Sequence, residues 1–384
     1  MKKRVYLLSA SDRFNYGDLM FPIIAKYALN ELGDFEFYNV ATVKADLSSC
    51  CAWDTEPYKI LLREDFQDQP TLIIAGGQVL GANWSKILSF ITPTYNYIYK
   101  KFNGSYLEKL TQRMFGSSEI SYPFIPSSSQ LLSKFNIIYH AVGGQNAHNL
   151  PEKQEVARAF SNCAYFSARE TNTQMAVADN FSIDVRLVPD SVLLISDMMP
   201  KKNLIRPHDR EYVCAQFGYL KSKSHLDEVV RQLKQLYEET GLDITLLSIG
   251  NCPGHDDNLS IDYIKQHADF PVVALPCETI EQITCALAHS SLFVGTSLHG
   301  VIVSMSYGNP FVPVSKNIAK IEAYTNTWAP EYLKGAVNFN EIASSSVERL
   351  SKFVDFNDRI DEQKELVKAS FDHISNIINN RNQG

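Results

Sequence analysis

The sequence predicts an α/β protein built from two Rossmann-like, doubly wound domains that face a cleft. Its 384 residues exceed one ordinary core and suit two domains of about 150–200 residues. Short apolar runs without strict alternation, typical of buried parallel strands, alternate with amphipathic helical segments almost throughout. This alternation stops at residues 196–209, which carry two prolines and a charge cluster, and then restarts. We therefore expect a linker there.

We expect the N-terminal domain to occupy residues 1–195. Its predicted strands are residues 4–10, 36–41, 71–75, 136–142, 165–168 and 185–188. Amphipathic segments at 22–32 and 154–162 lie between strands and give βαβ units. Residues 84–130 break this rhythm with many Tyr, Phe and Ser residues, so we interpret them as an insertion or an acceptor-facing lobe.

The second domain is expected at residues 210–340, with the same alternation. Its predicted strands are residues 211–217, 243–249, 272–275, 292–295 and 311–314. Its predicted helices are residues 225–240, 261–267, 280–289 and 300–307. A helical tail at 341–384 is expected to pack back across one or both domains.

Composition excludes several classes of protein. The net charge of −7 lacks the basic footprint of a dedicated nucleic-acid-binding protein, so an anionic ligand must be held by a local cluster of cations and backbone amides. Seven cysteines without a CxxC pair predict free thiols, and no group of residues has metal-ligand spacing. Neither a signal-peptide cleavage site nor an apolar stretch of about 18 residues is present. We expect a soluble cytoplasmic protein.

The strongest local signal is the segment 292–308, where a buried strand ends at Gly295 and an apolar helix follows. Thr296 or Ser297 can cap that helix, whose free N–H groups form an anion site. His299 lies at the rim of this site, as either a structural or a functional histidine. The helix end lowers the pKa of His299 and a bound phosphate raises it, so ligand binding could turn it into a proton donor. The donor-side residues of this segment are Thr296, Ser297, Leu298 and Gly300.

Charged residues after three other strands belong to the same sheet edge. Arg169 can clamp a carboxylate or phosphate, or form a surface ion pair. Asp190 can orient Arg169, act as a base, or cap a turn. Lys316 and Lys320 follow the last strand of the second domain, where one of them could reach the anion site; a solvated face is the alternative.

Weaker signals mark loops that follow strands of both domains. The segment 15–18 is either a ligand loop or a helix cap and turn. Paired glycines at 76–77 and 143–144 allow close backbone approach to a ligand, although neither has the GxGxxG spacing. Residues 250–257 are either a phosphate loop or a solvated turn. The acceptor or loop residues assigned here are Asn15, Gly17, Gly76, Gly77 and Gln145, with Asp18 as a candidate catalytic carboxylate.

The order of these motifs resembles the polysaccharide pyruvyl transferase family over roughly residues 10–325. The motifs are N-x-G-D at 15–18, Gly-Gly at 76–77, Gly-Gly-Gln at 143–145, S-A-R-E at 167–170, V-P-D at 188–190 and G-T-S-L-H-G at 295–300. The resemblance implies a GT-B-like fold and transfer of a pyruvyl group from phosphoenolpyruvate to a sugar as a ketal. It implies a setting in bacterial capsule, exopolysaccharide or cell-wall assembly, and a donor substrate without a further cofactor.

The resemblance also implies roles for individual residues. His299 matches the active-site histidine, as proton donor or in assisting phosphate departure, and Arg169 matches the donor-binding arginine. Lys320 falls where many members have a lysine, and Asp190 or Asp18 would deprotonate or orient the sugar hydroxyls. The N-terminal loop matches the acceptor side of the family.

One position departs from the family. Many members have an arginine two residues before the histidine, where this chain has Ser297. Either Lys316 or Lys320 supplies the missing cation, or the donor differs. Two other functions therefore stay open: a GT-B glycosyltransferase that uses a nucleotide sugar, and a non-catalytic glycan-binding protein.

The acceptor is also open, as a free, lipid-linked or nucleotide-linked sugar, and so is the oligomeric state. Aromatic residues of the 84–130 segment could stack on sugars or touch a membrane-bound acceptor, which would place the protein peripherally at the inner membrane face. Core packing explains them equally well.

Overall fold

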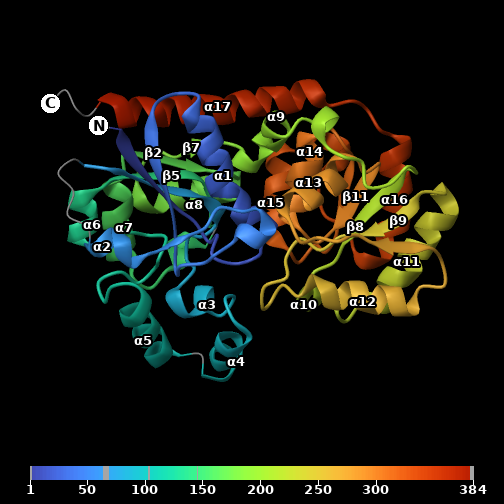
Figure 1. Cartoon of the computed structure of the whole chain (residues 1–384), viewed down its shortest axis with the longest axis horizontal. Coiled ribbons are helices and arrows are strands. Elements are labelled where there is room, and N and C mark those ends of the chain that lie inside the picture. Colours follow the sequence, from blue (N-terminus) through green and yellow to red (C-terminus); the bar gives the residue numbers. More distant parts are fainter. Residues whose placement is uncertain (1, 64–68, 103, 145, 381–384) are drawn as a thin grey trace.

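The computed structural model describes residues 2–63, 69–102, 104–144 and 146–380. Two parallel sheets lie side by side, and each is flanked by helices (Figure 1). The first sheet is formed by residues up to Leu187 and the second by residues 212–313. This is the α/β architecture with two doubly wound units that the sequence predicts.

The first sheet has the strand order β3-β2-β1-β4-β5-β6-β7, and all its pairs are parallel. Its strands are β1 (Lys3–Leu8), β2 (Phe35–Ala41), β3 (Glu56–Pro57), β4 (Thr71–Gln78), β5 (Asn136–Gly143), β6 (Tyr165–Ala168) and β7 (Arg186–Leu187). The central strands β4 and β5 are buried almost throughout, which explains their continuous apolar sequence.

Eight α-helices accompany the described strands of this sheet. They are α1 (Tyr16–Asn30), α2 (Lys59–Arg63), α3 (Trp84–Leu88), α4 (Pro93–Phe102), α5 (Ser105–Phe115), α6 (Ser129–Lys134), α7 (Lys153–Ser161) and α8 (Thr171–Phe181). Helix α1 begins six residues before the predicted start, so Pro22 lies inside it. Burial of its apolar face outweighs the hydrogen bond that the proline removes. Helices α3 to α5 project from the molecule as a separate lobe (Figure 1).

The second sheet has the order β10-β9-β8-β11-β12 and is also parallel. Its strands are β8 (Tyr212–Gln216), β9 (Asp243–Leu246), β10 (Val272–Ala274), β11 (Leu292–Gly295) and β12 (Phe311–Pro313). The helices around it are α10 (Tyr219–Ser222), α11 (Leu226–Thr240), α12 (Asp257–His267), α13 (Ile280–Ala288), α14 (Leu298–Ser306), α15 (Ala319–Trp328) and α16 (Ile342–Ser351).

The predicted linker at 196–209 begins inside a short helix, α9 (Ile195–Met198), that packs on α14. The Ser196 hydroxyl donates to the carbonyl of Ser306 at 2.8 Å, and the Ser306 hydroxyl donates to Leu193 at 2.7 Å. The beginning of this connection is therefore bonded to the second domain.

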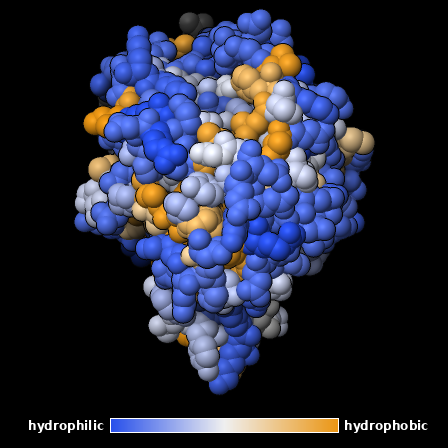
Figure 2. Space-filling view, turned by 90° about the vertical axis from the view of Figure 1, so that its right-hand side faces the viewer, coloured by the Kyte–Doolittle hydropathy of each residue, from blue (hydrophilic) through white to orange (hydrophobic). Residues whose placement is uncertain are grey.

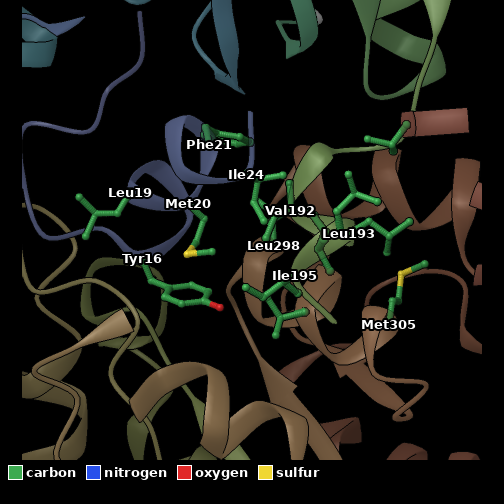
Figure 3. Close-up of a cluster of buried hydrophobic side chains, with 14 of the residues drawn as sticks. Tyr16, Leu19, Met20, Phe21, Ile24, Val192, Leu193, Ile195, Leu298 and Met305 are labelled. Atoms are coloured by element: carbon green, nitrogen blue, oxygen red, sulfur yellow. The ribbon is translucent and has the colours of Figure 1, made fainter. Parts of the chain in front are cut away.

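One hydrophobic cluster runs through the junction of the two units (Figure 3). Helix α1 contributes Met20 and Ile24, the connection contributes Leu193, and α14 contributes Leu298 and Met305. All five side chains are at most 2% exposed. The two sheets are thus joined by a shared core.

The C-terminal helices pack back, as predicted. Helix α17 (Asn357–Asn380) runs along the first unit (Figure 1), where the Lys3 ammonium donates to the carbonyl of Ile378 at 2.9 Å. Helix α16 packs on α11 of the second unit. Among the described helices, none is long and apolar enough to cross a bilayer. All seven cysteines are free thiols.

Candidate active site

A cavity of about 360 Å³ lies between the two units, where strands of both sheets end. Gln78 at the end of β4 and Arg169 directly after β6 line it from the first unit. Gln216 at the end of β8 and Thr296 directly after β11 line it from the second. Carboxyl ends of parallel strands are where ligands bind in doubly wound folds, so this cavity is the candidate site.

Arg169 is fixed on one wall of the cavity by three partners. Its guanidinium donates to Asp190 at 2.9 Å, to Glu170 at 3.1 Å and to Gln78 at 3.0 Å. Burial alone would lower the pKa of Arg169, but the carboxylates of Glu170 and Asp190 outweigh it and raise the pKa. Arg169 is therefore a permanent, oriented cation, and a surface ion pair is excluded because it is 1% exposed.

Asp190 fills two of the roles that its sequence position allows. It orients Arg169, and it accepts a hydrogen bond from the backbone N–H of Val192 at 3.1 Å as the cap of a short 3₁₀ helix. Burial raises the pKa of Asp190, against the pull of Arg169. Its carboxylate oxygen also lies 3.9 Å from Nε2 of His299, so one carboxylate joins the two units.

His299 stands in the first turn of α14 and is 8% exposed. Its ring packs edge-to-face on Phe21 of α1 at 5.3 Å, and Nε2 has no hydrogen-bond partner among the described residues. Burial lowers the pKa of His299 well below its usual value, and the cations Arg169 and Lys320 lower it further. The imidazole is therefore neutral in the free protein at neutral pH.

Gly17 of α1 leaves the space that the ring of His299 occupies. A Cβ at Gly17 would lie 1.7 Å from Nδ1 of His299, so only glycine lets the imidazole rest against helix α1. Gly76, at φ 85°, supports the same arrangement because a Cβ there would lie 2.5 Å from Phe21. Both predicted loop glycines thus act through close packing around His299. Gly77, at φ 88°, is the next residue of this strand end.

The first turn of α14 is capped as predicted by Ser297, whose hydroxyl accepts from the N–H of Gly300 at 3.3 Å. The N–H groups of Leu298 and His299 come before the first helical hydrogen bond, and both residues line the cavity. Thr296 does not cap the helix. Its hydroxyl accepts from the N–H of Gly218 at 2.8 Å and ties β11 to the end of β8.

Several cations line the cavity in addition to Arg169. Lys320 of α15 has its pKa lowered to about 7 by burial and by the nearby Lys221 and Arg169. The side chain of Lys221 in α10 is exposed, and its ammonium donates to the carbonyl of Thr296 at 3.3 Å.

Sequence reasoning missed Lys221 and Arg13, because α10 and the loop before α1 carry no phosphate-loop pattern. The one sequence signal for either residue is that Arg13 lies two residues before Asn15, in the predicted ligand loop.

The N-terminal loop reaches the second unit from the other side. Asn15 does not cap α1 with its side chain; its Nδ2 lies 3.5 Å from Nε2 of His255. Asp18 lines the cavity, and burial raises its pKa against the pull of Arg13, Lys320 and Arg169. Burial and the cations around the cavity lower the pKa of His255 to about 3, so His255 is neutral.

The segment 250–257 is a packed loop. The buried carboxylate of Asp257 accepts from the N–H groups of Ile249 and Gly250, both at 3.0 Å, and from Gln216 at 2.8 Å. Gly250, His255 and Asp257 all line the cavity.

Six predicted site residues do not line the cavity: Asp190, Gly17, Gly76, Gly77, Gly300 and Lys316. Lys316 lies 3.6 Å from Glu341 and lines a separate pocket beside His225 and Phe339. It stands before α15, whereas Lys320 lies in its first turn, so the two lysines face different pockets. Gln145 lies outside the described residues. No three His, Cys, Asp or Glu side chains group as a metal site in the described parts of the chain.

The sequence pattern of one protein family, polysaccharide pyruvyl transferase, matches residues 15–317. This chain belongs to that family. The match includes most of the residues that line the cavity; Ala10, Arg13, Ile318 and Lys320 lie outside it. No curated protein matches the transferase at a significant level.

Solved structures agree on the fold of this transferase. The Staphylococcus aureus MnaA–UDP structure is similar with a TM-score of 0.53 at 11% identity, covering 99% of this chain and 97% of that one. UDP-GlcNAc 2-epimerase from Methanocaldococcus jannaschii is similar with a TM-score of 0.54 at 11% identity, covering 98% and 99%. At this identity the likeness concerns the fold alone, which is GT-B.

Proposed function

We propose that this transferase moves a pyruvyl group from phosphoenolpyruvate to two hydroxyls of a sugar, forming a ketal during assembly of a bacterial surface polysaccharide. The observation that carries the proposal is the meeting of Arg169 from one unit and His299 from the other, with Asp190 between them. Arg169 and His299 line one cavity together with Lys320. This arrangement suits a small, strongly anionic donor.

Charge supports this choice of donor. Phosphoenolpyruvate carries about three negative charges near neutral pH, so its site needs several cations or helix-end amides. Arg169, Lys320 and Lys221 line the cavity, as does the first turn of α14. The family arginine that Ser297 replaces has candidate substitutes in Lys320 and in Lys221, which contacts the neighbouring Thr296 carbonyl. Lys316 is not one of them.

The reaction balances with one donor and one diol. C3 of phosphoenolpyruvate takes a proton and becomes a methyl group, while C2 forms two C–O bonds to the sugar oxygens. The C2–O bond to phosphate breaks, and the phosphate leaves with the electron pair. The two hydroxyl protons are balanced by one proton on C3 and one on phosphate, so no oxidant or further co-reactant is needed.

His299 is the proposed proton donor to C3 or to the departing phosphate. Its imidazole is neutral in the free protein, so it must gain a proton when the anionic donor binds and raises its pKa. Asp190, 3.9 Å away, stabilises the imidazolium. Because Asp190 is engaged by Arg169, we assign the sugar hydroxyls to Asp18, which lines the cavity with a raised pKa suited to a base.

Calorimetry with phosphoenolpyruvate, UDP and GDP tests the donor. We expect phosphoenolpyruvate to bind and both nucleotides to fail. Lys320→Ala should weaken binding by about tenfold or more, since it removes a partly buried cation from the cavity. Lys316→Ala is the matched control and should bind as the natural chain does, because Lys316 lies outside the cavity.

Each opposite result overturns the proposal in a specific way. Binding of UDP or GDP without phosphoenolpyruvate would indicate a nucleotide-sugar glycosyltransferase. Phosphoenolpyruvate binding without phosphate release across a panel of sugar acceptors would indicate a binding protein. Equal loss of affinity in Lys320→Ala and Lys316→Ala would show that the donor does not bind in the cavity.

A further inference from the structure

Helix α5 contacts α3 through polar side chains. The Glu108 carboxylate accepts from the N–H groups of Trp84 at 2.9 Å and Ser85 at 3.0 Å, at the start of α3. Gln112 donates to the carbonyl of Ile120 at 2.9 Å. The helix is therefore anchored by hydrogen bonds to backbone groups and by Phe115, which packs on the core cluster of the first unit. Its exposed large apolar side chains lie on the opposite side.

The outward face of α5 combines apolar and basic side chains. Tyr106 is 82% exposed, Leu110 44% and Met114 50%. Lys109 and Arg113 are exposed between them, so the five positions follow the i, i+3, i+4, i+7, i+8 spacing of one helix face. Its apolar members, at i, i+4 and i+8, form a stripe that helices of water-soluble domains normally bury.

Helix α4 of the same lobe also exposes apolar and basic side chains. None of its ten residues is buried, and Tyr97 and Phe102 are about 60% exposed. The ammonium of Lys101 lies over both rings, 5.6 Å from each centroid, and Lys100 is exposed beside it. We call the outward residues of both helices the α4–α5 face. Its members are Tyr97, Lys100, Lys101, Phe102, Tyr106, Lys109, Leu110, Arg113 and Met114.

The charge of this face is opposite to that of the whole chain. Helices α4 and α5 carry four basic residues and one acid, Glu108, which points inward, whereas the chain has a net charge of −7. The lobe forms the narrow lower end of the molecule, where pale and blue residues are mixed (Figure 2). A basic surface interleaved with aromatic and aliphatic side chains complements anionic headgroups above an acyl layer.

The lobe is also part of the cavity wall. Lys86 and Ile87 of α3 and Phe90 just after it line the cavity, and α5 is hydrogen-bonded to the start of α3. The α4–α5 face and part of the cavity wall therefore belong to the same lobe.

We propose that the α4–α5 face docks on the surface of an anionic lipid bilayer. The consequence, which rests on the proposed function, is that the acceptor sugar is attached to a membrane lipid and enters the cavity along the lobe. Aromatic residues alone would suit a soluble glycan. Leu110 and Met114 add aliphatic side chains, and the four cations favour anionic headgroups.

Vesicle co-sedimentation of the full chain tests docking without donor or acceptor. We expect binding to vesicles of phosphatidylcholine and phosphatidylglycerol at about 7:3, little binding to phosphatidylcholine alone, and weakening by salt. Lys100→Ala and Lys101→Ala should each weaken partitioning about fivefold. Leu110→Glu should abolish it. Lys223→Ala and Ile205→Glu, at exposed sites outside the lobe, are controls that should bind normally.

Absence of binding to the anionic vesicles, or equal losses in the controls, would overturn the proposal. So would lobe variants that change the oligomeric state in light scattering and leave vesicle binding unchanged, since the face would then join two copies of the chain. Because all the substituted side chains are exposed, circular dichroism should show unchanged folding. Phosphoenolpyruvate binding, measured separately, distinguishes failure of docking from failure of the proposed reaction.

Discussion

Lys320 and His299 line the cavity, and each has a pKa that shifts it toward its neutral form in the free protein. His299 is buried and Lys320 is half-buried near Arg169, and both have a lowered pKa, so fewer protons are bound in the free protein than the residue types suggest. An anionic donor reverses this effect because it favours both charged forms. Donor binding is therefore coupled to proton uptake.

This coupling predicts a pH dependence. The Lys320 pKa is about 7 in the free protein and rises when the donor binds, so the contribution of Lys320 to affinity is full below pH 7 and is lost as pH rises toward the higher pKa of the complex. Affinity for phosphoenolpyruvate should fall by up to about tenfold per pH unit, measured by calorimetry between pH 6.5 and 9. Lys320→Arg stays protonated and should flatten the profile. An equally steep profile in Lys320→Arg would assign the dependence to another group.

At the scale of elements, the site depends on the contact between the first turns of α1 and α14. Gly17 in α1 leaves space for the ring of His299 in α14, and Phe21 of α1 packs against the same ring. A helix that tolerates alanine well can therefore still require glycine at this position for a reason of packing.

His299→Ala should lower kcat by about 10²–10⁴-fold, the range typical of a positioned general acid. Gly17→Ala should lower kcat as well, because the new Cβ would lie 1.7 Å from Nδ1 and must displace the ring. The double variant should lose no more than His299→Ala, since both changes act on one group. Additive losses in steady-state kinetics would show that Gly17 acts elsewhere, and normal turnover in His299→Ala would remove the histidine from the mechanism.

At the scale of the whole molecule, the shared core makes the two units depend on each other. Leu193, in the connection between the units, is fully buried in the cluster that includes α1 and α14. The cavity walls, with Arg169 on one side and His299 on the other, are therefore held in a fixed relation by apolar packing.

Leu193→Ala should cost about 2–5 kcal/mol of unfolding free energy and reduce stability in both units together. Hydrogen exchange should show lower amide protection in β1 and in β11 alike. Leu366→Ala, at a position that is 47% exposed, should change stability by less than about 0.5 kcal/mol. Loss of protection confined to one unit would mean that the cores are independent.

Much of this protein follows from local sequence. The strands β6 and β11 have the residues that their apolar runs predict, and the cap of α14 by Ser297 follows from the order of residue types. The two-unit fold and the family follow for the same reason, because apolar period and motif order are properties of the chain itself. The start of α1 does not follow. Proline is common in the first turn of helices, so Pro22 predicts a helix start at that residue although it lies inside the helix.

Tertiary structure alone decided which residues meet. Lys316 and Lys320 both follow the last strand of the second unit, yet Lys316 lies near Glu341 and Lys320 lines the cavity. Lys221, Arg13 and the pairing of Gly17 with His299 carry no local pattern, because each depends on segments that are far apart in the chain. Glu108 of α5 is a further case. Its hydrogen bonds to backbone groups of α3 show which side of the helix faces inward, and the sequence of α5 does not. Side-chain periodicity specifies elements, whereas the packing of distant elements specifies the site.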